Sequence, residues 1–454
     1  MTGMRSTTRR WVVRLSIGLP VIAVTAVLVT LLINLSWFDE PLLPEIEALR
    51  KPRPITLDGN GFALALGFLA AEDRDPGAAG ARIISALGDR RDAGEPRTLG
   101  KEVVRSILGS PRADEGLGET LAFECQARHR LDCADRLVAW LDSVDMTQPR
   151  LALLIQRYET LLRQPHFSES PEPDLDTPWP PFGPIVALGR LRLAMSLRAD
   201  STPVFLEKAS QELTFWRMTL REGERLGTKM VALAAIRNTH DFISALLRAR
   251  ELDTHELESL RGFVHPFTPE ERDIGNAFLS QVRAHLLSGV PLVSLESPWM
   301  SRLLTQENAT FNLVFQQTIE PMRQRSSLDA RQFHDLEAYE PLRHELNFTP
   351  AVLFNLGGKL ALSRSPWDPH QFPSRVHDED GRIALILLQA ELEDHPEVDV
   401  ATVVQSSDNR DPYTGNAFAF DPLARTVGFT CLHTAFHPPE LADQCNVHLG
   451  RGTP

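Results

Sequence analysis

Residues 204–249 read VFLEKASQELTFWRMTLREGERLGTKMVALAAIRNTHDFISALLRA, and this stretch decides the fold class. Its apolar side chains recur at helical spacing over many turns. Ser201 or Thr202 can cap the start, with Pro203 in the first turn. Leucine, alanine, arginine and glutamate dominate the chain, and that balance favours helix over sheet. We therefore expect long helices over 185–250.

The same periodicity extends outward in both directions. Thr268-Pro269-Glu270-Glu271 is a typical helix start, because a threonine cap precedes proline and two acids at the positive end of the helix dipole. No fixed-period repeat is present, so a regular solenoid is not predicted. The further expected helices cover 61–87 with a break at 73–80, 99–109, 117–145, 151–162, 253–262, 268–287, 299–323, 328–346 and 381–393.

The C-terminal part changes character after the helix at 381–393. Residues 411–415, DPYTG, form a turn signal, and Ala417-Phe418-Ala419-Phe420 alternates as a half-buried strand does. A second turn at 421–424 leads into Thr426-Val427-Gly428-Phe429, which indicates a hairpin. The expected fold is therefore mainly α: a transmembrane helix, a stacked-helix ectodomain and a small C-terminal β-hairpin or sheet.

The N-terminal stretch 15–38, LSIGLPVIAVTAVLVTLLINLSWF, carries no charged side chain. A helix over it would be roughly 36 Å long, enough to cross a hydrocarbon core of about 30 Å. Arg5, Arg9, Arg10 and Arg14 precede it, which places the N-terminus in the cytoplasm by the positive-inside rule. A cleaved signal peptide or a buried core helix is the alternative, but the apolar run is long and lacks a small-x-small cleavage site.

The net charge of the chain limits the classes of molecule that we expect it to bind. The chain has 47 basic and 60 acidic residues, a net charge of −13, and its basic tail lies before the apolar stretch. An acidic exterior argues against nucleic-acid binding, which needs a basic face to neutralise phosphates. We expect the partners to be the lipid bilayer, through 15–38, and other envelope proteins.

Composition shifts divide the chain into segments. Prolines crowd 39–60 and 164–184, and the second of these is either a linker or an ordered surface loop. The predicted segments are a cytoplasmic tail (1–14), a transmembrane helix (15–38), a stalk (39–60), a helical subdomain (61–163), a proline-rich loop (164–184), a main helical domain (185–378) and a C-terminal helix with hairpin (379–454).

Four cysteines form two local pairs, Cys125 with Cys133 and Cys431 with Cys445. In an oxidising compartment such as a bacterial periplasm, this pattern predicts two disulfides. Free buried thiols are one alternative. A Cys/His metal site using His129, His433 or His437 is another, although the C-x₂₋₄-C spacing typical of zinc is absent.

The basic tail, single apolar helix, paired cysteines, QRYETLL helix at 156–162 and DPYTG ending resemble single-pass, inner-membrane-anchored proteobacterial envelope proteins of unassigned function. The DPxTG ending followed by a strand is also similar to that of some pseudopilin-like and planctomycete secreted proteins. The chain departs from pilins because no Gly-Phe-Thr-Leu-Glu site precedes the apolar run. The resemblance implies a bacterial inner-membrane protein with a periplasmic domain, and it implies no activity.

Two polar groupings could carry chemistry. His334, Glu337, Glu340 and His344 would share a helix face as a metal or acid/base site, but Pro341 interrupts them, and a solvated polar face explains them as well. His240 and Asp241 interrupt an apolar helix, where His240 could carry protons or join a buried polar network.

Weaker signals concern metal binding and glycosylation. Asp408, Asn409, Asp411 and Thr414 offer oxygen ligands for calcium, yet Asx-turns account for the same residues. Asn308 lies in a glycosylation-like triplet.

No catalytic motif or cofactor signature emerges from the sequence. We expect a non-enzymatic interaction or assembly factor of the cell envelope, without cofactor or metal. The alternatives are a periplasmic hydrolase that uses a Glu/His site and a small-molecule or lipid-binding ectodomain.

Overall fold

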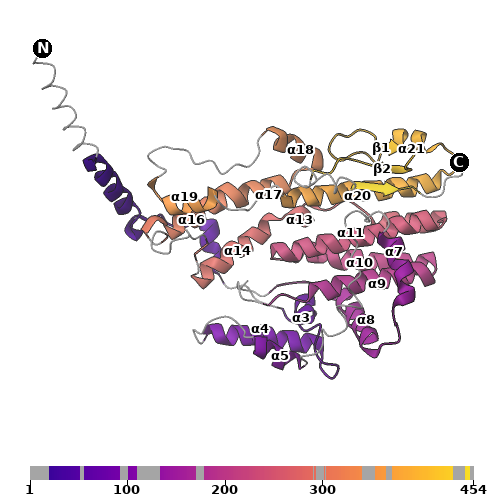
Figure 1. Cartoon of the computed structure of the whole chain (residues 1–454), viewed down its shortest axis with the longest axis horizontal. Coiled ribbons are helices and arrows are strands. Elements are labelled where there is room, and N and C mark those ends of the chain that lie inside the picture. The colour runs from indigo at the N-terminus through magenta and orange to yellow at the C-terminus, as the bar shows by residue number, and fades with distance from the viewer. Residues whose placement is uncertain are drawn as a thin grey trace, which may run out of the picture. The chain divides into compact units, whose positions relative to one another are not determined.

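The fold is mainly helical with a small antiparallel sheet near the C-terminus, which confirms the mainly α class and the C-terminal β element but not the transmembrane helix of the prediction (Figure 1). The chain divides into two compact units: Met1–Lys51, His285–Pro321 and Arg343–Asp368 form unit 1, and Pro52–Ala284, Met322–Leu342 and Pro369–Pro454 form unit 2. The computed structural model describes residues 20–51, 56–92, 101–109, 133–169, 178–289, 291–292, 301, 303–339, 353–363, 371–432 and 445–449.

Unit 2 contains most of the described helices, and most of the predicted ones appear with shifted ends. Its elements are α3 (Gly61–Leu66), α4 (Pro76–Asp92), α5 (Lys101–Leu108), α7 (Cys133–Trp140), η4 (Leu141–Ser143), α8 (Pro149–Leu162), α9 (Phe182–Ala199), α10 (Thr202–Glu222), α11 (Leu226–Ala249), α12 (Thr254–Phe263), α13 (Pro269–Arg272), most of α14 (Gly275–Ser288), α18 (Ala330–Tyr339), α20 (Gln371–Asp394) and α21 (Val400–Ser406).

The centre of unit 2 is the stretch that decides the fold, which forms α10 and α11. Figure 1 shows α9, α10 and α11 side by side, and α10 also packs against α12. Gly223 ends α10, and the buried Lys229 of α11 donates from Nζ to the Leu220 carbonyl at 2.6 Å. That bond satisfies one of the carbonyls that a helix leaves free at its C-terminus.

Polar caps set the ends of the shorter helices. Thr268 is the cap that the sequence predicts at this start, and with Glu271 it forms a reciprocal capping box. The expected single helix over 268–287 is instead two helices, because α13 ends at Arg272 and α14 begins at Gly275. Near the start of the unit, α3 and α4 approach closely at Gly80, where a Cβ would lie 1.7 Å from the Ala63 carbonyl oxygen.

The sheet consists of β1 (Ala419–Asp421), β2 (Thr426–Gly428) and β3 (Asn446–His448), in the order β1-β2-β3. Phe420 pairs with Val427, which pairs with Val447 on its other side. Leu385 and Leu388 of α20 share a buried cluster with Val427 and Val447, so the sheet packs on α20 (Figure 1). A disulfide joins Cys431 to Cys445 in the same cluster.

The helix α20 begins at Gln371, ten residues earlier than expected, so the predicted boundary between 185–378 and 379–454 lies inside it. Its first half, QFPSRVHDEDGR, lacks apolar periodicity and therefore does not look like a buried helix. It is nevertheless helical because its charged side chains pair with other elements of unit 2.

Unit 1 contains a helix from residue 20 to 33, η1 (Ser36–Phe38), α2 (Pro44–Glu47), η2 (Ala48–Arg50), α16 (Glu307–Val314), the π-helical turn η5 (Phe315–Ile319), the start of α17 (Glu320–Ser326) and α19 (Leu356–Ser363). Within the described residues, none of the helices combines the length and apolarity needed to cross a membrane. The described helix thus covers only part of the predicted transmembrane segment 15–38.

Residues 39–50, the first part of the segment 39–60 that the sequence predicts as a stalk, contain the short helices α2 and η2. The Asp39 carboxylate accepts hydrogen bonds from the backbone N–H groups of Asn308 (2.9 Å) and Ala309 (3.0 Å), at the start of α16. Asn312 of α16 donates to Glu40 at 2.7 Å, and Ile46 is fully buried. These side-chain hydrogen bonds therefore hold residues 39–50 against α16.

We predict that Asp39→Ala removes the cap of α16 and costs about 1 kcal/mol of local stability. Hydrogen exchange at the Asn308 and Ala309 amides measures the effect directly. Glu45→Ala, on the neighbouring exposed turn, is the control and should leave both amides protected. Equal exchange in the two variants would show that Asp39 does not hold α16.

Candidate functional site

His240 lies in a buried ionic network between α11 and α20. Its Nδ1 is 2.6 Å from Oε1 of Glu379, and the two side chains are 1% and 3% exposed. Asp241, the next residue of α11, instead pairs with Arg382. The Arg382 Nε lies 3.8 Å from the second Glu379 oxygen, so Glu379 and Arg382 link both partners into one network.

The network holds Glu379 in its ionised form. Burial alone would raise its pKa, but the hydrogen bond with His240 and the positive charges of Arg382 and Arg237 lower the pKa below the usual value. The His240 Nε2 is buried and has no hydrogen-bond partner among the described residues. A carboxylate on Nδ1 with Nε2 unused is the arrangement of a catalytic histidine, although 1% exposure leaves a substrate no visible route to Nε2.

Neighbouring residues of α20 join it to further elements. Asp378 accepts hydrogen bonds from the Tyr413 hydroxyl (2.6 Å) and the Leu432 amide (2.9 Å), beside the sheet. Asp380 accepts from the Phe267 amide at 2.7 Å, and burial raises its pKa to about 6 against the opposing effect of Arg272. Hydrogen bonds and ion pairs of successive charged residues thus hold α20 against several neighbouring elements.

His377 completes this stretch of α20. Its ring lies 4.6 Å from the Phe333 ring, and its Nδ1 is buried without a hydrogen-bond partner in the described part of the chain. Burial, helped by the charge of Arg272, lowers its pKa to about 3, so the imidazole is neutral at pH 7.

The other sequence-predicted grouping lies partly outside the described residues. His334 is on α18, and its ring centroid is 5.7 Å from that of Tyr413. Glu337 belongs to the same helix, but its side chain is outside the described set, as are Glu340 and His344 entirely. The structure therefore places only His334 of this constellation, and the shared face stays a prediction.

The described residues give the metal hypotheses little support. Their one close grouping of metal-ligand side chains is Asp378 with Cys431 and Cys445, and the disulfide occupies both sulfurs. Asp411 accepts from the Tyr413 and Thr414 amides, which makes the loop an Asx-turn. Cys133 is disulfide-bonded and buried, whereas Cys125, His129, His433 and His437 lie outside the described residues.

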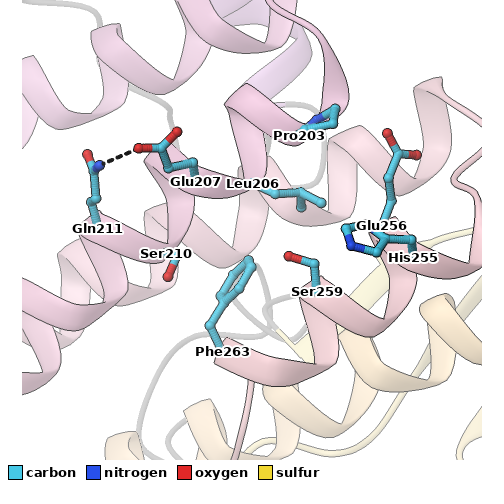
Figure 2. Close-up of a pocket in the computed structure, with 9 residues that line it drawn as sticks. All are labelled: Pro203, Leu206, Glu207, Ser210, Gln211, His255, Glu256, Ser259 and Phe263. Atoms are coloured by element: carbon cyan, nitrogen blue, oxygen red, sulfur yellow. Dashed lines mark hydrogen bonds between the residues drawn. The ribbon is translucent and has the colours of Figure 1, made fainter.

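An open groove lies between α10 and α12 on the surface of unit 2 (Figure 2). It encloses about 310 Å³. Figure 2 shows the Phe263 ring and the Ser259 hydroxyl pointing into the space between the two helices. Apolar groups lie beside carboxylates, an imidazole, hydroxyls and an amide: Pro203, Leu206, Glu207, Ser210, Gln211, His255, Glu256, Ser259 and Phe263.

The two glutamates that line the groove, Glu207 and Glu256, differ in their hydrogen-bond partners. Glu256 accepts from the Asp253 amide at 3.1 Å in the capping box of α12, so this carboxylate is part of the helix start. Glu207 is exposed and accepts from Gln211 Nε2 at 3.2 Å, the bond drawn in Figure 2. Glu207 is therefore the carboxylate most available to a ligand.

A buried polar cluster lies behind Gln211. Its amide oxygen accepts from Arg192 Nη2 at 2.6 Å, and Arg192 Nη1 is 3.3 Å from the carboxylate of the buried Glu212. The second oxygen of Glu212 accepts from the Tyr158 hydroxyl at 2.5 Å. Trp216 Nε1 in turn donates to that hydroxyl at 3.2 Å.

Burial raises the pKa of Glu212 to about 7, although Arg192 and the surrounding hydrogen bonds oppose the shift. The same burial, with the charge of Glu212 beside it, raises the pKa of Tyr158 well above its usual value. Gly189 makes room for this pair, since a Cβ there would lie 2.4 Å from the Tyr158 hydroxyl oxygen.

Sequence reasoning missed the groove and Glu212. A signal for Glu212 was present, because it follows Phe205 and Ala209 at helical spacing and therefore falls on the buried face of α10. The partners of His240 and Asp241 had no such signal, since Glu379 and Arg382 are far away in sequence.

Comparisons with known proteins found no matching family model, no similar curated protein and no similar solved structure.

We predict that His240→Leu destabilises the protein by about 3 kcal/mol, because Glu379 loses its closest partner while it remains buried. Urea unfolding of the variant measures the loss. His255→Leu, at an exposed position, is the control and should change stability by less than about 0.5 kcal/mol. A double-mutant cycle with Glu379→Leu that gives no coupling would contradict the pairing.

A second prediction concerns pH. The pKa of Glu212 is higher in the folded chain (about 7) than the ordinary value of 4.5, so the folded state holds more protons between these values and stability falls as pH rises through them. Glu212→Gln should lack this contribution, which is on the order of 3 kcal/mol. Urea unfolding at pH 4.5, 6 and 8 measures both slopes, with Glu207→Gln on the same helix as the exposed control.

Proposed function

We propose that this chain is a non-enzymatic interaction protein of the bacterial cell envelope, and that the groove between α10 and α12 receives a basic side chain of its partner. In this proposal residues 15–38 anchor the chain in the inner membrane, the N-terminus is cytoplasmic and the helical body is periplasmic. The uncharged stretch, the arginines before it and the resemblance to anchored envelope proteins support this placement.

The groove is the observation that carries the proposal. Its apolar floor, with Leu206 and Phe263, suits the methylene stem of lysine or arginine, which packs on apolar surface while its charged head remains at the rim. Glu207 lies at that rim and offers a carboxylate to the head group. The Phe263 ring can add a cation–π contact.

Charge supports the same class of partner. The net charge of −13 attracts basic segments over distances comparable to the Debye length and raises their association rate. Ser210, Gln211 and Ser259 add hydrogen-bonding groups around the groove, which suits a peptide backbone. A segment with one arginine or lysine in an extended backbone meets all of these features.

A periplasmic hydrolase is the second candidate function, and the unused Nε2 of His240 is the observation that favours it. Catalysis would require unit 2 to open between α11 and α20, because His240 and Glu379 are buried together. The small-ligand alternative has its own pocket in unit 1, beside Thr305 and Phe311. That pocket encloses about 140 Å³, whereas typical ligand sites measure roughly 300–1,000 Å³.

We predict that the full-length protein in lipid nanodiscs binds a fluorescein-labelled hexa-arginine peptide, and that Glu207→Gln weakens binding about tenfold by removing the exposed carboxylate. Fluorescence anisotropy at physiological ionic strength measures the affinity. Glu258→Gln is the matched control, because this exposed glutamate of α12 does not line the groove. Equal losses in both variants would mean that only the overall negative charge attracts the peptide.

A further inference from the structure

A continuous set of hydrogen bonds and ion contacts joins the groove to the core of unit 2. It runs from Glu207 through Gln211 and Arg192 to Glu212, with contacts of 3.2, 2.6 and 3.3 Å. Glu207 and Gln211 are exposed, whereas Glu212 is 1% exposed. Four adjoining groups on α9 and α10 therefore span the distance from solvent to a buried carboxyl.

Arg192 is the shared member of this set. One guanidinium nitrogen faces the groove through Gln211, and another faces Glu212, so a single positive charge serves both sides. Its Nη1 also donates to the Lys208 carbonyl at 3.2 Å, which limits its freedom to move away. A change of charge in the groove must therefore alter the interaction of Arg192 with Glu212, and a change of charge at Glu212 must alter the interaction of Arg192 with the groove.

The remaining charges near Glu212 do not provide a substitute for Arg192. The Tyr158 hydroxyl, from α8, donates to the Glu212 carboxylate. Trp216 Nε1, from α10 itself, donates to the Tyr158 hydroxyl. The Oε1 atom of Glu159, on α8, lies 3.8 Å from Arg192 Nε, so this carboxylate faces the Arg192 guanidinium. Of the charged groups on the other packed helices, Glu271 of α13 is paired with Arg217 of α10, and Lys229 of α11 is bound to the Leu220 carbonyl.

We propose that cation binding in the groove and proton binding at Glu212 are linked through Arg192, so that each disfavours the other. The inference rests on the proposed function, because it specifies how the same groove is regulated. A cation at Glu207 repels Arg192 and favours its pairing with ionised Glu212. Protonation of Glu212 leaves the charge of Arg192 without its inner partner, and that charge then opposes a cation in the groove.

The linkage gives the groove a defined pH response. Thermodynamic reciprocity requires that ligand affinity rise as Glu212 loses its proton and that binding release a proton from Glu212. Burial raises the pKa of this carboxyl to about 7, so the response falls near neutral pH. The affinity of a basic ligand should therefore be lower in a mildly acidic envelope than at pH 8.

The test uses full-length protein in nanodiscs and an unlabelled hexa-arginine peptide with acetylated N-terminus and amidated C-terminus, so that only guanidinium groups are charged and the peptide charge is constant over the range; calorimetry measures the affinity. All measurements are made in a His255→Gln background, because His255 lines the groove and glutamine keeps a polar side chain there without an ionisable group. We expect the affinity to rise on the order of fivefold between pH 5.5 and 8.5. Calorimetry in two buffers of different ionisation enthalpy should show proton release at pH 7.

Two variants separate the linkage from other effects. Glu212→Gln removes the proton site, and Gln211→Met removes the bridge at an exposed position while Glu212 remains able to titrate. Both should bind with little pH dependence. An unchanged pH response in Gln211→Met, or no proton release from the background protein, would overturn the linkage while peptide binding through Glu207 stands. Loss of peptide binding at every pH would instead reject the proposed function and the linkage together.

Discussion

Charge that is buried along one helix, α20, constrains much of unit 2. Asp378, Glu379, Asp380 and Arg382 are all in the interior, where an ionised group without a partner costs several kcal/mol. Three neighbouring regions hold them: the sheet region holds Asp378 through Tyr413, α11 holds both Glu379 and Arg382 through His240 and Asp241, and α13 holds Asp380 through Arg272. The arrangement of these elements around α20 follows from the need to satisfy these groups together.

In unit 1, a few backbone amides likewise need hydrogen-bond partners. The first amides of α16 need acceptors, and Asp39 supplies them from the chain that follows the apolar stretch. Asn312 adds a contact to the Pro41 carbonyl from the same helix. Pro44 in this segment is compatible with a short, packed helix, because it occupies the first turn of α2, where no amide donor is needed.

The groove and the Glu212 cluster show how surface and core chemistry can meet on one helix. Glu207, Gln211 and Glu212 all belong to α10, yet a helix turns about 100° per residue, so consecutive positions 211 and 212 face solvent and core respectively. Arg192, from α9, reaches both positions because its guanidinium has several donors in a fixed plane. A partner at the surface can thereby influence a proton in the interior without a large movement of the backbone.

The sequence alone determined the local features, for which a few neighbouring residues suffice. These include the long helices at 185–250, the helix start capped by Thr268 and the hairpin after DPYTG, whose turns and alternation are short-range properties. It also identified His240 and Asp241 as unusual polar residues in an apolar helix. Only the tertiary structure decided their partners on α20, the early start of α20 at Gln371 and the groove beside Glu207, because pairing between residues far apart in sequence leaves no periodic trace.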